Sequence, residues 1–409
     1  MERERAKEVL LSCFGAAVAA VDPEQAVARD LQIPQVAGRI VILALGKAAP
    51  AMTRGVAAAL AADELEGIAV SNHRDHVPPG IDLRISSHPV PDESSLEAGR
   101  ALLDLADSLT EEDLAIVLIS GGGSALAEVP VPGVSLADIA ATNELLLRSG
   151  ADIVQTNTVR RRLSVFKGGG LAAAIAPARS VTLVVSDVVG DAPMTIASGP
   201  TVAADEPAEA ARGVVASLSL ESLLPVSVMA ALQQAPVHPA VPEEQALKVI
   251  ASGAVAANGA ARAAEGLGFG ATVVDTRLTG DAAAAAGEVL QRSGFGVSIF
   301  AGETTVLVTG EGQGGRNQEA ALVAATLIEG LPGVHFLAAG TDGRDGTTIG
   351  AGAYVDGDTV RRCREVGLDV NDVLDRNDSG TLFAAIGDQI VTGPTGTNIG
   401  DIWLVFRSE

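Results

Sequence analysis

The stretch LAIVLISGGGSALAE, residues 114–128, runs from six apolar residues through three glycines into a helix-favouring segment. A strand that is covered on both faces has such a continuous apolar run. The same succession of a short apolar run and an Ala/Leu-rich segment recurs in RIVILALG, GIAVSN, DLRISSH and SVTLVVSD. The sequence therefore predicts an α/β fold built from parallel β-α-β units.

A second series of apolar runs follows in the last 170 or so residues. Its members are ALKVIAS, GATVVDTR, TTVLVTG, VHFLAAG and DIWLVF. Between the two series, Pro225, Pro236, Pro239 and Pro242 interrupt any long element. We therefore expect an N-terminal domain over residues 1–239 and a smaller C-terminal α/β domain over residues 240–409.

Composition limits the function classes. Hydrophobic residues make up 47% of the chain and charged residues 19%, which is typical of a globular protein. The formal charge of −23 disfavours binding to nucleic acid or to an anionic membrane surface, so an anionic ligand must be met by local donors. No apolar run approaches the roughly 20 residues that cross a bilayer. We expect a cytoplasmic protein, and its oligomeric state does not follow from the sequence.

Polar and glycine clusters follow the ends of the expected strands. In open parallel sheets, ligands bind at the carboxyl ends of the strands. Gly121, Gly122 and Gly123 can bring backbone N–H groups close to an anion, and Ser124 can bind an oxygen or cap a helix. Lys47 follows the strand in RIVILALGK and can stabilise a phosphoryl group there. The alternatives are a tight turn and a solvated lysine.

Three further side chains have the chemistry of a phosphate-handling site. Lys167 precedes a second glycine run, although it can also be a cation that lies along a helix. Asp187 follows a strand and can accept a proton from a substrate hydroxyl or hold a metal. Asp191 can hold a metal or form a turn. The chain has no Walker A motif, so its phosphate chemistry is not of the P-loop type.

The segment VLVTGEGQGGRNQE, which begins at Val306, contains the pattern G-x-G-x-x-G of dinucleotide-binding proteins. Such a site also needs an acidic residue about 20 residues further on. Asp342 lies 27 residues beyond Gly315, which is a poor match. Arg316 at the start of the following helix suits an anion that carries more charge than the pyrophosphate of a dinucleotide. Asp342 and Asp345 can instead form a polar loop that binds metal or substrate.

Seven segments in this order resemble the glycerate 2-kinases of the MOFRL type. They are ALGKAAPAM, SSHPVPDESS, LISGGGSAL, NTVRRRLSVFKGGGLA, SDVVGDAPMTIASGPT, TGEGQGGRNQE and AGTDGRDGTTIGAGAYVDG. The resemblance covers nearly the whole chain. It implies a larger Rossmann-like N-terminal domain, a smaller α/β C-terminal domain and an active site in the cleft between them. It also implies transfer of the γ-phosphoryl group of ATP to the 2-hydroxyl of D-glycerate, with Mg²⁺ as the metal.

The resemblance suggests a role for each candidate residue. Lys47 and Arg316 are similar to the cationic stabilisers, and Asp187 to the base or metal-associated acid. Asp191 and Asp342 are candidate metal ligands. The remaining candidates would bind nucleotide or substrate; they are Ser120, Gly121, Gly122, Gly123, Ser124, Lys167, Glu311, Gly312, Gly314, Gly315 and Asn317.

Two other functions remain open at this point. An NAD(P)H-dependent hydroxypyruvate reductase is the enzymatic alternative, and it depends on the one glycine fingerprint. A non-catalytic protein that binds sugar phosphates is the second, because a GGGS loop also suits a binding module.

Overall fold

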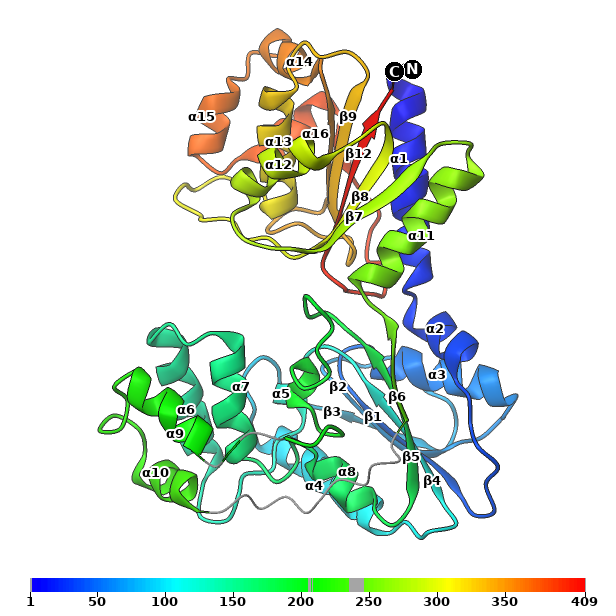
Figure 1. Ribbon diagram of the computed structural model, residues 1–409, viewed down its shortest axis with the longest axis vertical. Helices are drawn as coiled ribbons and strands as arrows, with labels where there is room; N and C mark the ends of the chain where they lie inside the picture. The colour runs from blue at the N-terminus through cyan, green and yellow to red at the C-terminus, as the bar shows by residue number, and fades with distance from the viewer. Residues whose placement is uncertain (1, 205–206, 208, 235–245, 409) are drawn as a thin grey trace. The chain divides into compact units, whose positions relative to one another are not determined.

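The structure is a computed structural model that describes residues 2–204, 207, 209–234 and 246–408 (Figure 1). The chain forms two compact units. The larger unit consists of Pro23–Ser186 and Asp191–Ile250, and the smaller of Met1–Asp22, Asp187–Gly190 and Ala251–Glu409. The domain boundary expected near residue 240 lies outside the described residues.

The larger unit contains a six-stranded sheet with the order β3-β2-β1-β4-β5-β6. Its strands are β1 (Ile40–Leu45), β2 (Glu66–Ser71), β3 (Ile81–Ile85), β4 (Leu114–Ile119), β5 (Arg179–Val185) and β6 (Ala246–Ala251). Neighbouring strands from β3 to β5 pair in parallel. Every residue of β4 is buried, as its unbroken apolar run predicts. The strand order reverses direction between β1 and β4, and such a switch point is where doubly wound sheets bind ligands.

Helices connect these strands and add a separate layer. They are α2 (Pro23–Asp30), α3 (Ala49–Leu60), α4 (Glu93–Asp107), α5 (Gly123–Leu126), α6 (Leu136–Arg148), α7 (Ile153–Arg162), α8 (Gly170–Ile175), α9 (Glu209–Ser217) and α10 (Val226–Gln233). Side chains of α6, α7, α9 and α10 share a hydrophobic cluster, which Figure 1 shows as a helical layer beside the sheet.

The smaller unit contains a second six-stranded sheet with the order β11-β10-β9-β12-β8-β7. Its strands are β7 (Ala271–Leu278), β8 (Gly296–Gly302), β9 (Val334–Gly340), β10 (Gly352–Asp356), β11 (Gln389–Ile390) and β12 (Asp401–Arg407). Its helices are α1 (Arg3–Ala20), α11 (Gly253–Gly266), α12 (Ala282–Arg292), α13 (Arg316–Leu327), α14 (Thr359–Glu365), α15 (Val370–Asp375) and α16 (Ser379–Ile386). In this sheet β7 and β8 pair in parallel. The neighbouring pairs β8–β12, β12–β9, β9–β10 and β10–β11 are antiparallel.

The fold class is confirmed, but three details differ from the sequence-based expectation. The segment TTVLVTG is not a strand: residues 306–309 have no regular structure, and Leu307 is 76% exposed. The strand in ALKVIAS is β6, which joins the first sheet and not the second. The second sheet is mixed and not parallel, because β12 lies between β8 and β9 and runs opposite to both.

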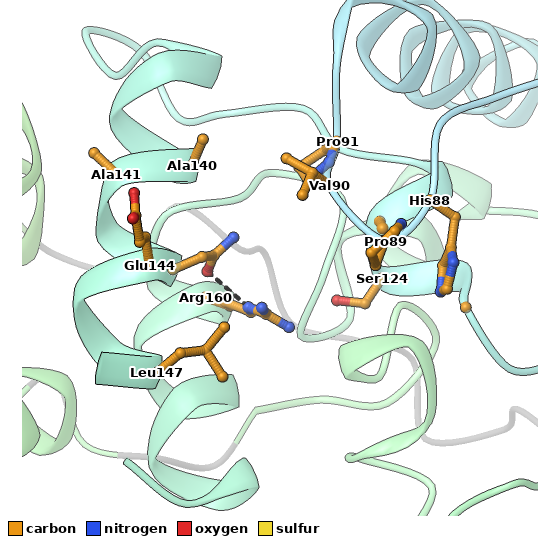
Figure 2. Close-up of a pocket in the computed structure, with 13 residues that line it drawn as sticks. His88, Pro89, Val90, Pro91, Ser124, Ala140, Ala141, Glu144, Leu147 and Arg160 are labelled. Carbon is orange, nitrogen blue, oxygen red and sulfur yellow. Dashed lines mark hydrogen bonds between the residues drawn. The ribbon is translucent and has the colours of Figure 1, made fainter. Parts of the chain in front are cut away.

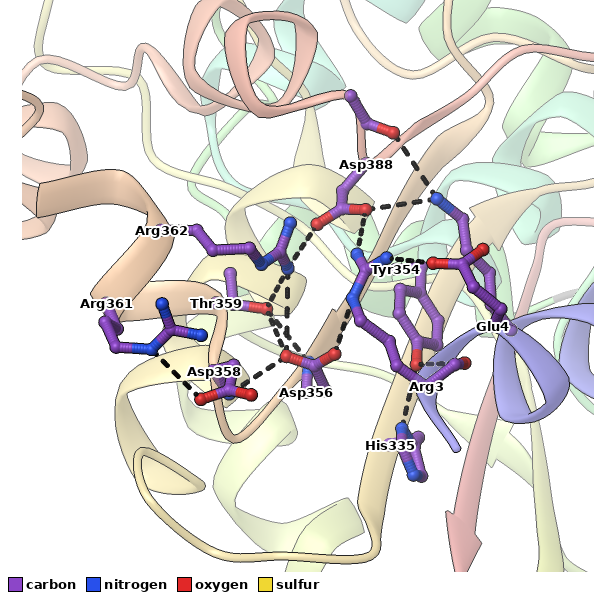
Figure 3. Close-up of polar contacts among 12 residues, drawn as sticks. Arg3, Glu4, His335, Tyr354, Asp356, Asp358, Thr359, Arg361, Arg362 and Asp388 are labelled. Carbon is purple, nitrogen blue, oxygen red and sulfur yellow. Dashed lines mark hydrogen bonds and ion pairs between the residues drawn. The ribbon is translucent and has the colours of Figure 1, made fainter. Parts of the chain in front are cut away.

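The first helix of the chain belongs to the smaller unit. It packs on α11 so closely that a Cβ at Gly259 would lie 2.7 Å from Ala20. At its N-terminal end, Arg3 pairs with Asp356 at 2.8 Å and also with Asp388. Figure 3 shows these carboxylates and the Tyr354 ring gathered around Arg3. Because these contacts join residues more than 350 positions apart, a single cut along the sequence cannot divide the chain into its two units.

Candidate functional site

The loops after β1 and β4 are joined at the switch point of the first sheet. The Lys47 N–H donates to the Gly121 carbonyl at 2.9 Å, and the Ala48 N–H donates to Ser120 Oγ at 3.0 Å. Gly46 has a φ of 128°, and a Cβ there would lie 2.1 Å from Ser120 Oγ. The close approach of the two loops therefore requires glycine at position 46. It holds the half-buried Lys47 beside the GGGS segment.

The GGGS turn is packed against Lys47 and His88. Gly122 has a φ of 85°, and a Cβ there would lie 3.1 Å from the His88 ring and 3.3 Å from Lys47 Cε. Burial, with the Lys47 charge as the second cause, holds the pKa of His88 below its usual value. Both causes favour the neutral imidazole of His88 beside Lys47.

Ser124 is part of a chain of hydrogen bonds and not a helix cap. Its Oγ lies 2.9 Å from Ser198 Oγ, and Ser198 Oγ donates to Asn157 Oδ1 at 2.8 Å. Ser198 is fully buried and has a φ of 61°, a conformation that costs energy for a residue other than glycine. The segment 195–199 is thus held in a strained turn against the GGGS loop.

A cavity of about 660 Å³ opens beside this turn within the larger unit. Figure 2 shows the loop from His88 to Pro91 and Ser124 on one side and α6 on the other. Arg160 of α7 extends into the space between them, and its Nε donates to Asn143 Oδ1 at 2.8 Å. The cavity therefore combines apolar walls with a cation that is held in place.

Lys167, a candidate ligand of nucleotide or substrate, is buried in the larger unit. Its ammonium forms an ion pair with Glu128, and the two side chains are 2% and 1% exposed. Burial lowers the pKa of the Lys167 ammonium, and the Glu128 carboxylate opposes this shift. The geometry thus gives Lys167 a structural partner, while a role in ligand binding stays a prediction.

The second glycine loop packs against residues 376–380 of its own unit. The N–H groups of Thr309 and Gly310 donate to Asn377 Oδ1, at 2.8 and 2.9 Å. Those of Gly312 and Gln313 donate to the Arg376 carbonyl and the Asp378 carboxylate, both at 2.9 Å.

Close packing also explains why this loop contains glycine at four positions. A Cβ at Gly310, Gly312, Gly314 or Gly315 would come within 2.3 to 2.5 Å of atoms of Arg376, Ser379 or Asp345. None of these four glycines has a positive φ. Close packing of two segments accounts for the repeated glycine, and binding by Glu311, Gly312, Gly314 and Gly315 stays a prediction.

Arg316 and Asn317, at the start of α13, lie in a network of carboxylates, of which Asp345 and Asp401 are buried and Glu303 is exposed. Arg316 binds Asp401 through Nε at 2.7 Å and Nη2 at 3.0 Å, and it binds Glu303 through Nη1 at 3.0 Å. Burial opposes its charge, but the hydrogen bonds and attraction of Asp401, with that of Glu303, hold the pKa of Arg316 above its usual value. Three of the five N–H donors of the guanidinium are engaged in this way.

Asn317 is similarly engaged within the protein. Its amide donates to Asp401 at 2.9 Å and to Asp345 at 3.3 Å, and its oxygen accepts from Trp403 Nε1 at 2.7 Å. Asp345 also accepts the backbone N–H groups of Asn317 and Gln318, at 3.1 and 2.7 Å. It therefore stabilises the first turn of α13 from a separate loop.

The three remaining acidic candidates differ in their surroundings. Burial raises the pKa of the Glu303 carboxyl against the attraction of Arg316, and the charges of Asp401 and of Asp187 add to this rise. Asp191 has a φ of 54°, which is a turn conformation. Asp342 accepts the Arg344 N–H at 2.9 Å within its own loop. Across the described residues, no group of three or more His, Cys, Asp or Glu side chains could hold a metal ion.

The candidates thus fall into two groups. Lys47, Ser120, the three glycines and Ser124 come together in the larger unit. Asp187, Arg316, Asn317 and the second glycine loop belong to the smaller one. Within the described part of the chain, no helix is long and apolar enough to span a membrane.

Two family models match this chain: the domain of unknown function DUF4147 over residues 9–233, and the MOFRL family over residues 296–401. The D-glycerate 2-kinase of Thermotoga maritima is 37% identical over 98% of both chains. A crystal structure of glycerate kinase from the same organism has a TM-score of 0.90 at 35% identity, over 99% of this chain and all of the other. The chain belongs to the MOFRL-type glycerate kinase family.

Some members of the family carry another name. A protein from Agrobacterium vitis that bears a hydroxypyruvate reductase name is 41% identical over 97% of this chain and 93% of its own length. In the structure described above, the G-x-G-x-x-G pattern follows an irregular segment and not a strand. In this member of the glycerate kinase family, the G-x-G-x-x-G pattern therefore lacks the preceding strand of a dinucleotide-binding site.

Several residues of the site were not identified from the sequence. Asp401 begins β12 and Glu303 follows β8, so only the fold reveals that both carboxylates contact Arg316. Arg160 and Asn143 lie on two helices that close a cavity together. His88 lies in the loop before α4 and lines the same cavity. A signal was available for His88, within the family motif SSHPVPDESS, and for Arg160, within NTVRRRLSVFKGGGLA.

Proposed function

We propose that this chain transfers the γ-phosphoryl group of ATP to the 2-hydroxyl of D-glycerate, giving 2-phosphoglycerate and ADP. The observation that carries the proposal is the full-length likeness to a protein named D-glycerate 2-kinase, with the motifs ALGKAAPAM and LISGGGSAL at the carboxyl ends of the paired strands β1 and β4. The strand ends, the glycine turn and Lys47 supply the positioning and the positive charge that phosphoryl transfer needs.

The roles of individual residues follow from the chemistry. The 2-hydroxyl oxygen forms a bond to the γ-phosphorus, the bond to the β,γ-bridging oxygen breaks, and the hydroxyl proton passes to a carboxylate. We assign Asp187 as the acceptor of that proton. Lys47 is proposed to stabilise the charge on the transferring group. Arg316 is the second proposed cation, and its ion pairs with Asp401 and Glu303 fix its orientation.

Mg²⁺ is proposed to enter as the complex with ATP. Proteins usually bind Mg²⁺ through one or two carboxylates and the substrate phosphates, so a dedicated cluster of acidic residues is not required. Asp187 and Asp191 supply carboxylates of this kind in the segment after β5. Asp342 is a weaker candidate, because its carboxylate already accepts the Arg344 N–H in its own turn.

The test is to incubate the purified protein with D-glycerate and MgATP, and separately with hydroxypyruvate and NADH or NADPH. We expect ADP to form only when D-glycerate is present. The Lys47→Ala variant, made and purified in the same way, should lose this activity, which excludes a contaminating kinase. Oxidation of the reduced cofactor with hydroxypyruvate and no ADP formation would favour the second candidate, a hydroxypyruvate reductase. Binding without either reaction would favour a non-catalytic protein.

A further inference from the structure

The cavity beside the GGGS turn has two different ends. Its walls are largely apolar, with Pro89, Val90 and Pro91 on one side and Ala140, Ala141 and Leu147 of α6 on the other. Figure 2 shows these two walls facing each other. At one end Arg160 extends toward Ser124, whereas Glu144, the acidic residue of the lining, lies on the α6 wall and pairs with Arg148 at 2.7 Å. A ligand that fills the cavity therefore has an apolar flat part and an anionic part.

The size of the cavity excludes glycerate as its main occupant. A volume of about 660 Å³ is in the range of sites that enclose a drug-sized ligand. A three-carbon hydroxy acid fills only a small part of it and makes no use of walls formed by proline, valine and leucine. A purine nucleoside has the flat apolar faces and the polar edge that these walls would accommodate.

The polar end is continuous with the loops that the proposed reaction uses. Gly122 and Ser124 line the cavity, and Gly122 is also the residue packed against Lys47. Arg160 is half-buried and held by Asn143, so a cation is already positioned at this end. In a chain with a formal charge of −23, such a local cation is what a polyphosphate requires.

We propose that this cavity binds the nucleoside of ATP, between the segment from His88 to Pro91 and helix α6. The phosphates then extend past Arg160 and Ser124 toward the GGGS turn and Lys47. This inference rests on the proposed kinase function, and it assigns the first glycine loop, not G-E-G-Q-G-G, to the nucleotide. D-Glycerate binds elsewhere.

The test fills the cavity without removing a polar contact. Ala140→Phe enlarges a half-buried residue of α6 that lines the cavity. Val90→Trp enlarges a residue of the opposite wall that is 58% exposed. Ala137→Phe is the matched control, because Ala137 lies on the same helix but is exposed and is not part of the lining. Binding of ADP is measured by isothermal titration calorimetry, and KM is measured for ATP and for D-glycerate.

We expect both cavity variants to raise the Kd for ADP and the KM for ATP by about tenfold or more, with the KM for D-glycerate changed by less than about twofold. Ala137→Phe should leave all three constants unchanged. Thermal unfolding of each variant separates loss of binding from loss of the fold, and Val90→Trp serves if Ala140→Phe does not fold.

Two results would overturn the inference: ADP binding that is unchanged in both cavity variants, or a KM that rises for D-glycerate alone. Failure of the proposed function is distinguishable from this. If the wild-type protein binds ADP and the cavity variants lose that binding, the nucleotide assignment holds even when D-glycerate is not phosphorylated.

Discussion

The buried pair of Lys167 and Glu128 gives a decisive prediction about a residue that the sequence suggested as a ligand. Both side chains are at most 2% exposed. Lys167→Met leaves the Glu128 carboxylate buried without its cation, which costs about 3–5 kcal/mol. In a unit of this size, about 2–4 °C is lost per kcal/mol, so the melting temperature should fall by roughly 6–20 °C.

The assay is thermal unfolding followed by calorimetry, for Lys167→Met and for the double variant Lys167→Met with Glu128→Gln. The double variant removes both charges and should recover most of the loss. An unchanged melting temperature together with weaker binding of ATP or D-glycerate would refute the structural role and make Lys167 a ligand contact.

Four further predictions concern three residues of the smaller unit and Lys47. Arg316→Ala should lower kcat by on the order of 10²-fold or more and should also destabilise the protein by about 3 kcal/mol, because Asp401 is 1% exposed. Lys47→Ala should lower kcat similarly with little change in unfolding temperature; kinetics and calorimetry on both variants separate the two effects. Burial raises the pKa of Asp345 to about 6, so between pH 4 and pH 7 the native state binds more protons than the unfolded state. The free energy of unfolding should then fall by up to about 3 kcal/mol as the pH rises through this window, and Asp345→Asn should remove this contribution in denaturant titrations. Arg3→Ala should lower the melting temperature by a few degrees, since Arg3 pairs with two buried carboxylates, whereas Arg5→Ala, at an exposed i,i+3 pair, should not.

The centre of the first sheet was predictable because its inner strands are covered on both faces. β1 and β4 are unbroken apolar runs, and each is followed by a helical segment. The outer strands β3 and β6 are partly exposed and contain charged residues, and the β6 segment was expected in the second sheet. The second sheet was not predictable in the same way. Its segment GVSIFAG, which forms β8, contains two glycines and a serine, whereas the strongly apolar TTVLVTG remains irregular and exposed. Local preference does not reveal which apolar segment finds a partner strand.

In the candidate site, too, features that are adjacent in the sequence were predictable, and contacts between distant residues were not. Lys47 and the GGGS turn were found because a strand end and a glycine run are adjacent in the sequence. The partners of Arg316 could not be found in this way, since Asp401 is 85 residues away and lies in a strand. The second glycine loop was interpreted from its spacing, but the reason for its glycines is packing against Arg376 and Asp378, which only the folded chain shows.

The most direct test of the central claim is the identity of the product made from D-glycerate and MgATP by the purified protein. Phosphorus NMR of the reaction mixture distinguishes phosphate on the 2-oxygen from phosphate on the 3-oxygen. We predict 2-phosphoglycerate and ADP in equal amounts. Exclusive formation of 3-phosphoglycerate would contradict the assigned acceptor hydroxyl, and the absence of any phosphorylated glycerate would contradict the kinase itself.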